Sequence, residues 1–171
     1  MRVQCERRGS VFGPDYYLKS VHDIDFEALA ARGVDTLLID LDNTLLPRDR
    51  SDVPEEFVRW VEELPSHGFQ AALVSNNWHE HVKEIAEQLG LPLVAKSVKP
   101  LPFAFLAALR GLGSTRRRAA VVGDQMFTDV LGGKFLGMAT VLVLPLSSSD
   151  LPHTLMLRHV EKLLLAGRQP S

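Results

Sequence analysis

Short runs of Val, Ile, Leu and Ala alternate with longer stretches of helical periodicity in this 171-residue chain, and that alternation constrains its fold more than any other feature. Strands that are apolar on both faces are typical of parallel sheets with helices on each side. The predicted strands span residues 36–40, 69–75, 93–95, 119–123 and 139–144. We therefore expect an α/β fold built on a central parallel sheet.

Helical periodicity and terminal residues predict helices next to these strands. The predicted helices span residues 54–64, 78–89, 101–112, 125–136 and 153–166, with a weaker helical pattern at 25–32. Asn77 is the predicted N-cap of the second helix because Glu80 stands three residues further on, and Gly90 is placed to end that helix. This order of strands and helices makes five βα units.

The length of the chain is typical of one domain, and we expect a single domain over residues 1–171. A formal net charge of −2 provides no general attraction to nucleic acid, so no nucleic-acid partner is expected. Cys5 is the only cysteine, which excludes an intramolecular disulfide and a cysteine-rich zinc site. The N-terminus has no apolar signal stretch, and no apolar run reaches the roughly 18 residues of a membrane span. These features predict a cytoplasmic protein.

Several polar residues follow the predicted strands, at the edge where open parallel sheets bind their ligands. They are Asp40 and Asp42 after the first strand, Ser75 and Asn76 after the second, Lys99 beyond the third, and Asp124 after the fourth. Because the carboxyl ends of parallel strands share one edge of the sheet, we expect these side chains to converge on one site.

Asp40 and Asp42 stand two residues apart before the chain turns at Pro47, so both carboxylates can face one pocket. A carboxylate in that position can attack phosphorus and form an aspartyl-phosphate, which divides one difficult displacement into two easier steps. Asp40 is the predicted nucleophile. A second carboxylate can protonate the leaving oxygen and then accept a proton from water, a contribution of about 10²–10⁴-fold. Asp42 is the predicted general acid and base.

Phosphoryl transfer also needs donors for the phosphoryl oxygens, a fixed cation and carboxylates that hold a metal ion. Ser75, Lys99 and Asp124 supply these groups. Asp129 stands one turn into the following helix, where it can orient a metal-bound water or Lys99. Because the ligands are all oxygen atoms, Mg²⁺ rather than zinc is the expected cofactor.

In their order along the chain, four segments resemble the four motifs of the haloacid dehalogenase (HAD) superfamily. They are Asp40-Leu41-Asp42-Asn43-Thr44, Ser75, Lys99, and Gly123-Asp124 with Asp129. The resemblance implies a Rossmann-like three-layer sandwich and a phosphatase with Asp40 as nucleophile and Asp42 as acid and base. It further implies Ser75, Lys99, Thr44 and Asn76 beside the substrate, and Asp40, Asp124 and the backbone carbonyl of Asp42 around Mg²⁺.

A wider set of segments looks like the YqeG-type phosphatases of HAD subclass IIIA and covers most of the chain. These segments are Pro14-Asp15-Tyr16-Tyr17, Ile24-Asp25, Asp42-Asn43-Thr44-Leu45, Lys99-Pro100, Gly132-Gly133-Lys134 and Gly137-Met138. The group is similar to phosphatidylglycerophosphate phosphatase. This similarity implies a phosphorylated substrate, with a phospholipid headgroup as one candidate.

Some of these residues also have plainer interpretations. Lys96 stands three residues before Lys99 and could provide the cation, although Lys99 is favoured. Ser75 could serve simply as a helix-capping hydroxyl, and Asn76 could either contact phosphate or shape the turn. Asp129 could simply interact favourably with the positive end of a helix dipole. The basic run 116–118 is best interpreted as a solvated loop and helix 153–166 as docked on the sheet, although both could meet an anionic membrane.

Two intervals separate the first three motifs, and each has room for one helix with a loop or a short strand. Neither interval holds a separate cap domain. We therefore expect a capless or minimally capped site that is open to bulky phosphate carriers, including phospholipid headgroups at a membrane surface. Two alternatives remain open. One is a phosphatase of the same fold that acts on a small metabolite, and the other is a domain that binds phosphate groups or a partner without turnover.

Overall fold

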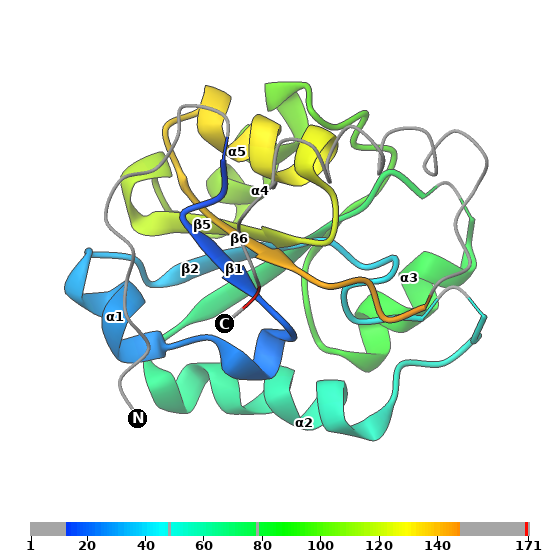
Figure 1. The fold of residues 1–171 in the computed structure, drawn as a ribbon. Helices are drawn as coiled ribbons and strands as arrows, with labels where there is room; N and C mark the ends of the chain where they lie inside the picture. Colours follow the sequence, from blue (N-terminus) through cyan, green and yellow to red (C-terminus); the bar gives the residue numbers. More distant parts are fainter. Residues whose placement is uncertain (1–12, 48, 78, 148–169, 171) are drawn as a thin grey trace.

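The computed structural model of the protein describes residues 13–47, 49–77, 79–147 and 170. Its centre is a six-stranded sheet in which all neighbouring strands are parallel (Figure 1). The strands are β1 (Tyr16–Leu18), β2 (Thr36–Ile39), β3 (Gln70–Val74), β4 (Leu93–Val94), β5 (Ala119–Gly123) and β6 (Ala139–Val143), in the spatial order β1-β6-β5-β2-β3-β4. The predicted parallel sheet is confirmed, with β1 as an additional edge strand.

Asp15 holds β1 beside β6. Its backbone N–H donates to the carbonyl oxygen of Thr140 at 3.0 Å, and its carboxylate accepts from the Thr140 N–H at 2.9 Å. Lys134 Nζ lies 3.0 Å from the other carboxylate oxygen of Asp15. Because the partners of Asp15 are far away in the sequence, no local pattern predicts this three-residue strand.

Helices cover both faces of the sheet, so the fold has three layers (Figure 1). On one face lie α1 (Phe26–Ala31), α2 (Glu55–Glu63) and α3 (His81–Gln88), and on the other lie α4 (Pro102–Gly111) and α5 (Leu131–Phe135). Short turns of helix, η1 (Val21–Asp23), η2 (Leu64–His67) and η3 (Arg116–Arg118), and the π-helix η4 (Met126–Val130) complete the described elements. Alternate residues of β2 point to opposite layers, because Leu37 and Ile39 join one core cluster and Leu38 joins the other.

Two predicted helices differ from the observed ones in their first turns. The prediction that Asn77 caps the second helix is wrong, because α3 begins at His81 with Glu80 at its N-cap position. The predicted helix 125–136 consists of η4 followed by α5, and it ends before Gly137, whose φ of 68° is left-handed. The predicted helix 153–166 lies outside the described residues.

The described residues form no separate domain over the carboxyl edge of the sheet. Between β2 and β3 these residues form α2 and η2, and between β3 and β4 they form α3. The prediction of a site without a separate cap domain is therefore confirmed for this part of the chain. In the same residues, no helix has the length and apolar character needed to cross a membrane.

Candidate active site

The carboxyl ends of β2, β3 and β5 bring three of the predicted site residues to one edge of the sheet. Asp40 follows β2, Ser75 follows β3 and Asp124 follows β5, and all three are buried. The backbone N–H of Asp40 donates to the carbonyl oxygen of Val122 at 2.8 Å. The hydrogen bonding of the sheet therefore continues to Asp40 and holds it beside the end of β5.

Lys99 lies between two of the acidic residues. Its Nζ atom is 2.5 Å from Asp40 Oδ1 and 2.7 Å from Asp129 Oδ1. The side chain of Lys99 is only 2% exposed, which makes this a contact inside the protein. Lys96, the alternative cation, is exposed. The structure therefore places Lys99 at the carboxylates.

Burial and charge act strongly on these groups. Burial raises the pKa of Asp40 well above its ordinary value, and although Lys99 acts in the opposite direction, the charges of Asp129, Asp124 and Asp42 raise it further. Burial lowers the pKa of Lys99, but Asp129 and Asp40 outweigh that effect and raise it above 10.5. Lys99 is therefore held as a cation among these carboxyl groups.

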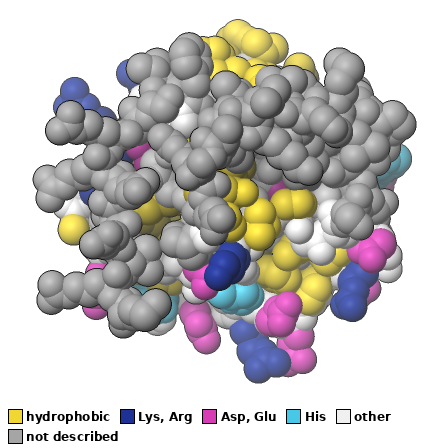
Figure 2. All heavy atoms as spheres, in the orientation of Figure 1, with side chains coloured by type: hydrophobic (Ala, Val, Ile, Leu, Met, Phe, Trp, Pro, Cys, Tyr) yellow, Lys and Arg dark blue, Asp and Glu magenta, His cyan; other side chains and the backbone are white. Residues whose placement is uncertain are grey.

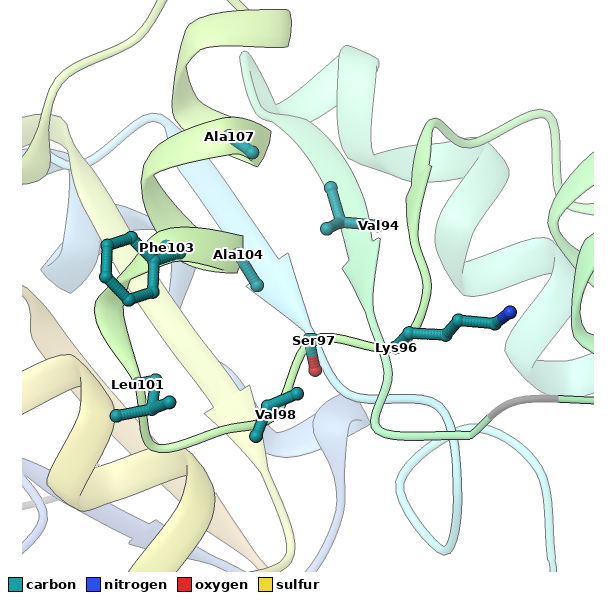
Figure 3. Close-up of a pocket in the computed structure, with 8 residues that line it drawn as sticks. All are labelled: Val94, Lys96, Ser97, Val98, Leu101, Phe103, Ala104 and Ala107. Carbon is teal, nitrogen blue, oxygen red and sulfur yellow. The ribbon is translucent and has the colours of Figure 1, made fainter.

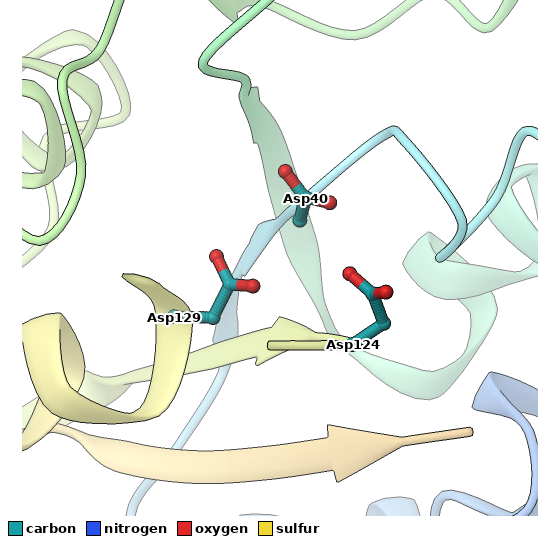
Figure 4. A group of neighbouring side chains, drawn as sticks. All are labelled: Asp40, Asp124 and Asp129. Carbon is teal, nitrogen blue, oxygen red and sulfur yellow. The ribbon is translucent and has the colours of Figure 1, made fainter. Parts of the chain in front are cut away.

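Asp40, Asp124 and Asp129 could together hold a metal ion. One oxygen atom of each lies within 4.8 Å of the others, and Figure 4 shows the three carboxylates facing a common space. Three carboxyl groups that offer only oxygen donors fit a hard divalent cation. Asp129 also has protein contacts of its own, because its Oδ2 atom accepts from the Gln125 N–H at 3.3 Å and the Thr128 hydroxyl at 3.2 Å.

Gly123 makes room for Asp129, a role that no sequence motif predicted. A Cβ atom at this position would lie 2.3 Å from Asp129 Cγ, far closer than atoms of two side chains approach. The last residue of β5 must therefore be glycine for Asp129 to reach Lys99. The glycine immediately before Asp124 is the only sequence signal of this requirement.

Asp42 faces a separate group of polar side chains. Its Oδ2 atom accepts a hydrogen bond from the Ser75 hydroxyl at 3.2 Å, and its Oδ1 atom accepts from the Asn77 amide at 3.1 Å. The Asn77 backbone N–H donates to Ser75 Oγ at 3.0 Å and closes the group. Asn77 is a site residue that sequence reasoning missed, since its position before a helix favoured a cap.

Asn76 contacts the loop that contains Lys99, and Thr44 contacts Asp40. The Asn76 side-chain oxygen accepts from the Lys99 N–H and from the Ser97 hydroxyl, both at 2.7 Å. Asn76 therefore holds the loop on which Lys99 stands, which goes beyond the turn-shaping role considered from the sequence. The buried Thr44 hydroxyl donates to Asp40 Oδ2 at 3.4 Å. All eight predicted site residues thus lie along one edge of the sheet.

Comparisons with known proteins identify similar sequences and a similar fold. A family model described as HAD-hydrolase-like matches residues 97–149. The phosphatidylglycerophosphate phosphatase 1 of Arabidopsis thaliana is 28% identical over 168 residues, which cover 90% of this chain and 46% of that protein. This chain therefore spans about half the length of the plant relative. The solved structure of 3-deoxy-D-manno-octulosonate 8-phosphate phosphatase from Yersinia pestis has the same fold, with a TM-score of 0.53, 14% identity and coverage of 82% of this chain and 85% of that one.

A bacterial relative is much more similar. "Probable phosphatase YqeG" of Bacillus subtilis (strain 168) is 40% identical over 156 residues. The matched region covers 91% of this chain and 91% of that protein, so the two proteins are similar over nearly their whole lengths. The protein belongs to the YqeG-type phosphatases of the HAD superfamily.

Proposed function

We propose that the protein is a Mg²⁺-dependent phosphomonoesterase that acts through an aspartyl-phosphate on Asp40. The observation that carries this proposal is the position of the Asp40 carboxylate, buried at the end of β2 against Lys99 and near oxygen atoms of Asp124 and Asp129. When bound by Asp40 and Asp124, Mg²⁺ would supply the positive charge that lets an anionic nucleophile approach an anionic phosphate.

In the first step, an Asp40 oxygen attacks phosphorus, the ester P–O bond breaks, and Asp42 gives its proton to the departing alkoxide. In the second step, Asp42 accepts a proton from water as the water oxygen attacks the same phosphorus. The bond from phosphorus to Asp40 then breaks, which releases inorganic phosphate and restores the carboxylate. Ser75 and Lys99 hold the phosphoryl oxygens, Asp129 holds Lys99, and Asn77 orients Asp42.

The proposed substrate is a phospholipid whose headgroup ends in a phosphate monoester. Two observations support it: the name of the plant relative, and a carboxyl edge that no separate domain covers within the described residues. A peripheral position at the cytoplasmic face of a membrane follows from this proposal. A soluble phosphometabolite is the alternative substrate for the same residues, and a non-catalytic phosphate-binding domain is the alternative to turnover.

One assay series tests these proposals. p-Nitrophenyl phosphate with Mg²⁺ should be hydrolysed, EDTA should stop the reaction, and BeF₃⁻ with Mg²⁺ should bind at Asp40 as a mimic of the aspartyl-phosphate. Phosphatidylglycerophosphate should then be hydrolysed with a higher kcat/KM than sugar phosphates and nucleoside monophosphates. Activity that is unchanged by EDTA, or BeF₃⁻ bound away from Asp40, would contradict the mechanism. A preference for a soluble metabolite would replace the substrate and leave the mechanism in place.

A further inference from the structure

Helix α4 is apolar on both of its sides. Its inner side, which includes Phe105 and Leu109, is buried against the sheet, whereas Phe103 and Leu106 on its outer side are exposed. A helix that is hydrophobic all round is normally covered all round. In Figure 2, charged side chains gather along the lower edge over α2, and hydrophobic side chains appear at the upper edge, where α4 and α5 lie. The outer side of α4 therefore has the composition of a covered surface.

The exposed apolar side chains are concentrated in one short segment. Of the six large hydrophobic residues that are exposed in the described part of the chain, four lie in residues 98–106. These four, which we call the apolar rim, are Val98 (54% exposed), Leu101 (48%), Phe103 (74%) and Leu106 (39%). Val98, Leu101 and Phe103 also line a surface hollow of about 330 Å³, and Figure 3 shows Lys96 extending away from them.

The apolar rim begins at the site itself. Val98 and Leu101 flank the Lys99-Pro100 pair, so they stand on the loop that carries the buried lysine. The conformation of Val98 adds to the argument, because its φ of 49° is left-handed and a β-branched residue is disfavoured there. Glycine or asparagine would suit both that backbone and exposure to water better. Neither folding nor hydration accounts for an exposed valine at this position.

The charged residues in the sequence around the apolar rim are all basic. No Asp or Glu occurs between Glu87 and Asp124, whereas Lys96 and Arg110 are exposed on either side of the rim. An occupant that matches this surface is apolar and anionic, and it must present a phosphate monoester to Lys99. A lipid leaflet that contains the phosphorylated substrate combines these three properties, because its acyl chains lie directly beside its charged headgroups.

We infer that the apolar rim is the surface by which this protein docks on an anionic membrane, with Val98, Leu101, Phe103 and Leu106 entering the leaflet beside the headgroup that reaches Asp40. This inference rests on the proposed lipid substrate. It also separates docking from the basic run Arg116–Arg118, which precedes β5 and lies at the opposite edge of the sheet. The five residues of β5 put about 17 Å between those arginines and the site.

A matched pair of phenylalanine substitutions tests the inference. Phe103 is 74% exposed in the apolar rim, and Phe135 is 67% exposed at the end of α5, where the chain turns toward the amino end of β6. With vesicles of phosphatidylcholine and phosphatidylglycerophosphate, Phe103→Ser should lower kcat/KM on the order of ten- to a hundredfold, the factor expected for one large apolar side chain that is no longer buried. Phe135→Ser should leave it unchanged. Both variants should hydrolyse p-nitrophenyl phosphate at the wild-type rate.

Equal vesicle activities of the two variants would overturn the inference. So would a concentration-dependent dimer that Phe103→Ser disperses without loss of vesicle activity, because the rim would then be covered by a second copy. Co-sedimentation with phosphatidylglycerol vesicles keeps this test separate from the proposed substrate. If wild-type protein and Phe135→Ser sediment with the vesicles and Phe103→Ser does not, the inference holds even when phosphatidylglycerophosphate is not hydrolysed. If the wild-type protein does not sediment, the inference fails while the phosphatase mechanism stands.

Discussion

Two contacts between acidic and basic side chains lie at opposite edges of the same strands, and they differ in burial. At the carboxyl edge, Lys99 lies between Asp40 and Asp129, and these side chains are 2%, 7% and 1% exposed. At the amino edge, Arg118 before β5 contacts Asp35 before β2, and these side chains are 54% and 32% exposed. The same sheet therefore carries three charged side chains that are removed from water and one ion pair that water screens.

The difference in burial determines how strongly the charges at each edge depend on one another. Removal from water raises the pKa of Asp40 and makes the site depend on Lys99 for compensation. At the exposed pair, burial also raises the pKa of Asp35, but hydrogen bonds from Arg118 and Thr36 outweigh it and lower the pKa below 3.8. Charges in the buried cluster depend on one another, so substitutions there should have much larger effects than substitutions at the exposed pair.

The largest expected effect is on turnover. Asp40→Asn removes the proposed nucleophile while keeping its size, and kcat should fall by at least about 10⁴-fold, as for other enzymes that lose their nucleophile. The same change removes one buried negative charge, so the free energy of unfolding without metal should not decrease. Steady-state kinetics and urea unfolding measure the two quantities. Wild-type turnover in this variant would remove Asp40 from the mechanism.

Loss of the buried cation should be the next largest effect. Lys99→Met leaves Asp40 and Asp129 facing each other inside the protein, and breaking a buried pair in this way costs about 3–5 kcal/mol of the free energy of unfolding. Lys96→Met is the matched control, since Lys96 is exposed, and it should change stability by less than about 1 kcal/mol. Urea unfolding without metal compares them. A larger loss in Lys96→Met would reverse the assignment of the lysine.

A third substitution tests the acid and base. Asp42→Asn should lower kcat by about 10²-fold or more for an alkyl phosphate, because the leaving alkoxide then lacks its proton donor. The loss should be smaller for p-nitrophenyl phosphate, whose leaving group needs little protonation. Equal losses for the two substrates would assign Asp42 to binding instead of proton transfer.

Asn77 should have a smaller effect in the same direction. Asn77→Ala removes one hydrogen bond to Asp42, worth about 1 kcal/mol or roughly fivefold in kcat. If Asn77 is a positioning residue, the loss for an alkyl phosphate should again exceed the loss for p-nitrophenyl phosphate. A variant with lower thermal stability but an unchanged ratio of the two rates would make the role of Asn77 structural.

The exposed pair should give the smallest effect. Arg118→Ala should lower the free energy of unfolding by less than about 1 kcal/mol and leave kcat unchanged. Because Arg118 lowers the pKa of Asp35, its contribution is present above pH 3.8 and is lost as pH falls through the folded-state pKa. NMR titration should show the Asp35 pKa rising in the variant. If Arg118→Ala lowers the free energy of unfolding as much as Lys99→Met does, burial does not explain the difference between the two edges.

The parts of the fold that sequence predicted are those with local signals. The apolar runs of β2, β3 and β5 mark strands that are buried on both faces, and Gly90 and Gly137 end their helices with φ values of 64° and 68°. β1 has three residues and is held by the contact of Asp15 with Thr140, 125 positions away. A strand that depends on so distant a partner leaves no local pattern.

The candidate site divides in the same way. By itself the sequence determined that Asp40, Asp42, Ser75 and Asp124 would lie at one edge of the sheet, because residues that follow parallel strands necessarily share that edge. Only the tertiary structure decided which lysine contacts the buried carboxylates. It also decided that Asn77 binds Asp42 instead of capping a helix. It also decided that Gly123 leaves the space for Asp129. The physical reason is that hydrogen bonds and close contacts depend on distances of a few ångströms between loops, which strand order and residue spacing do not specify.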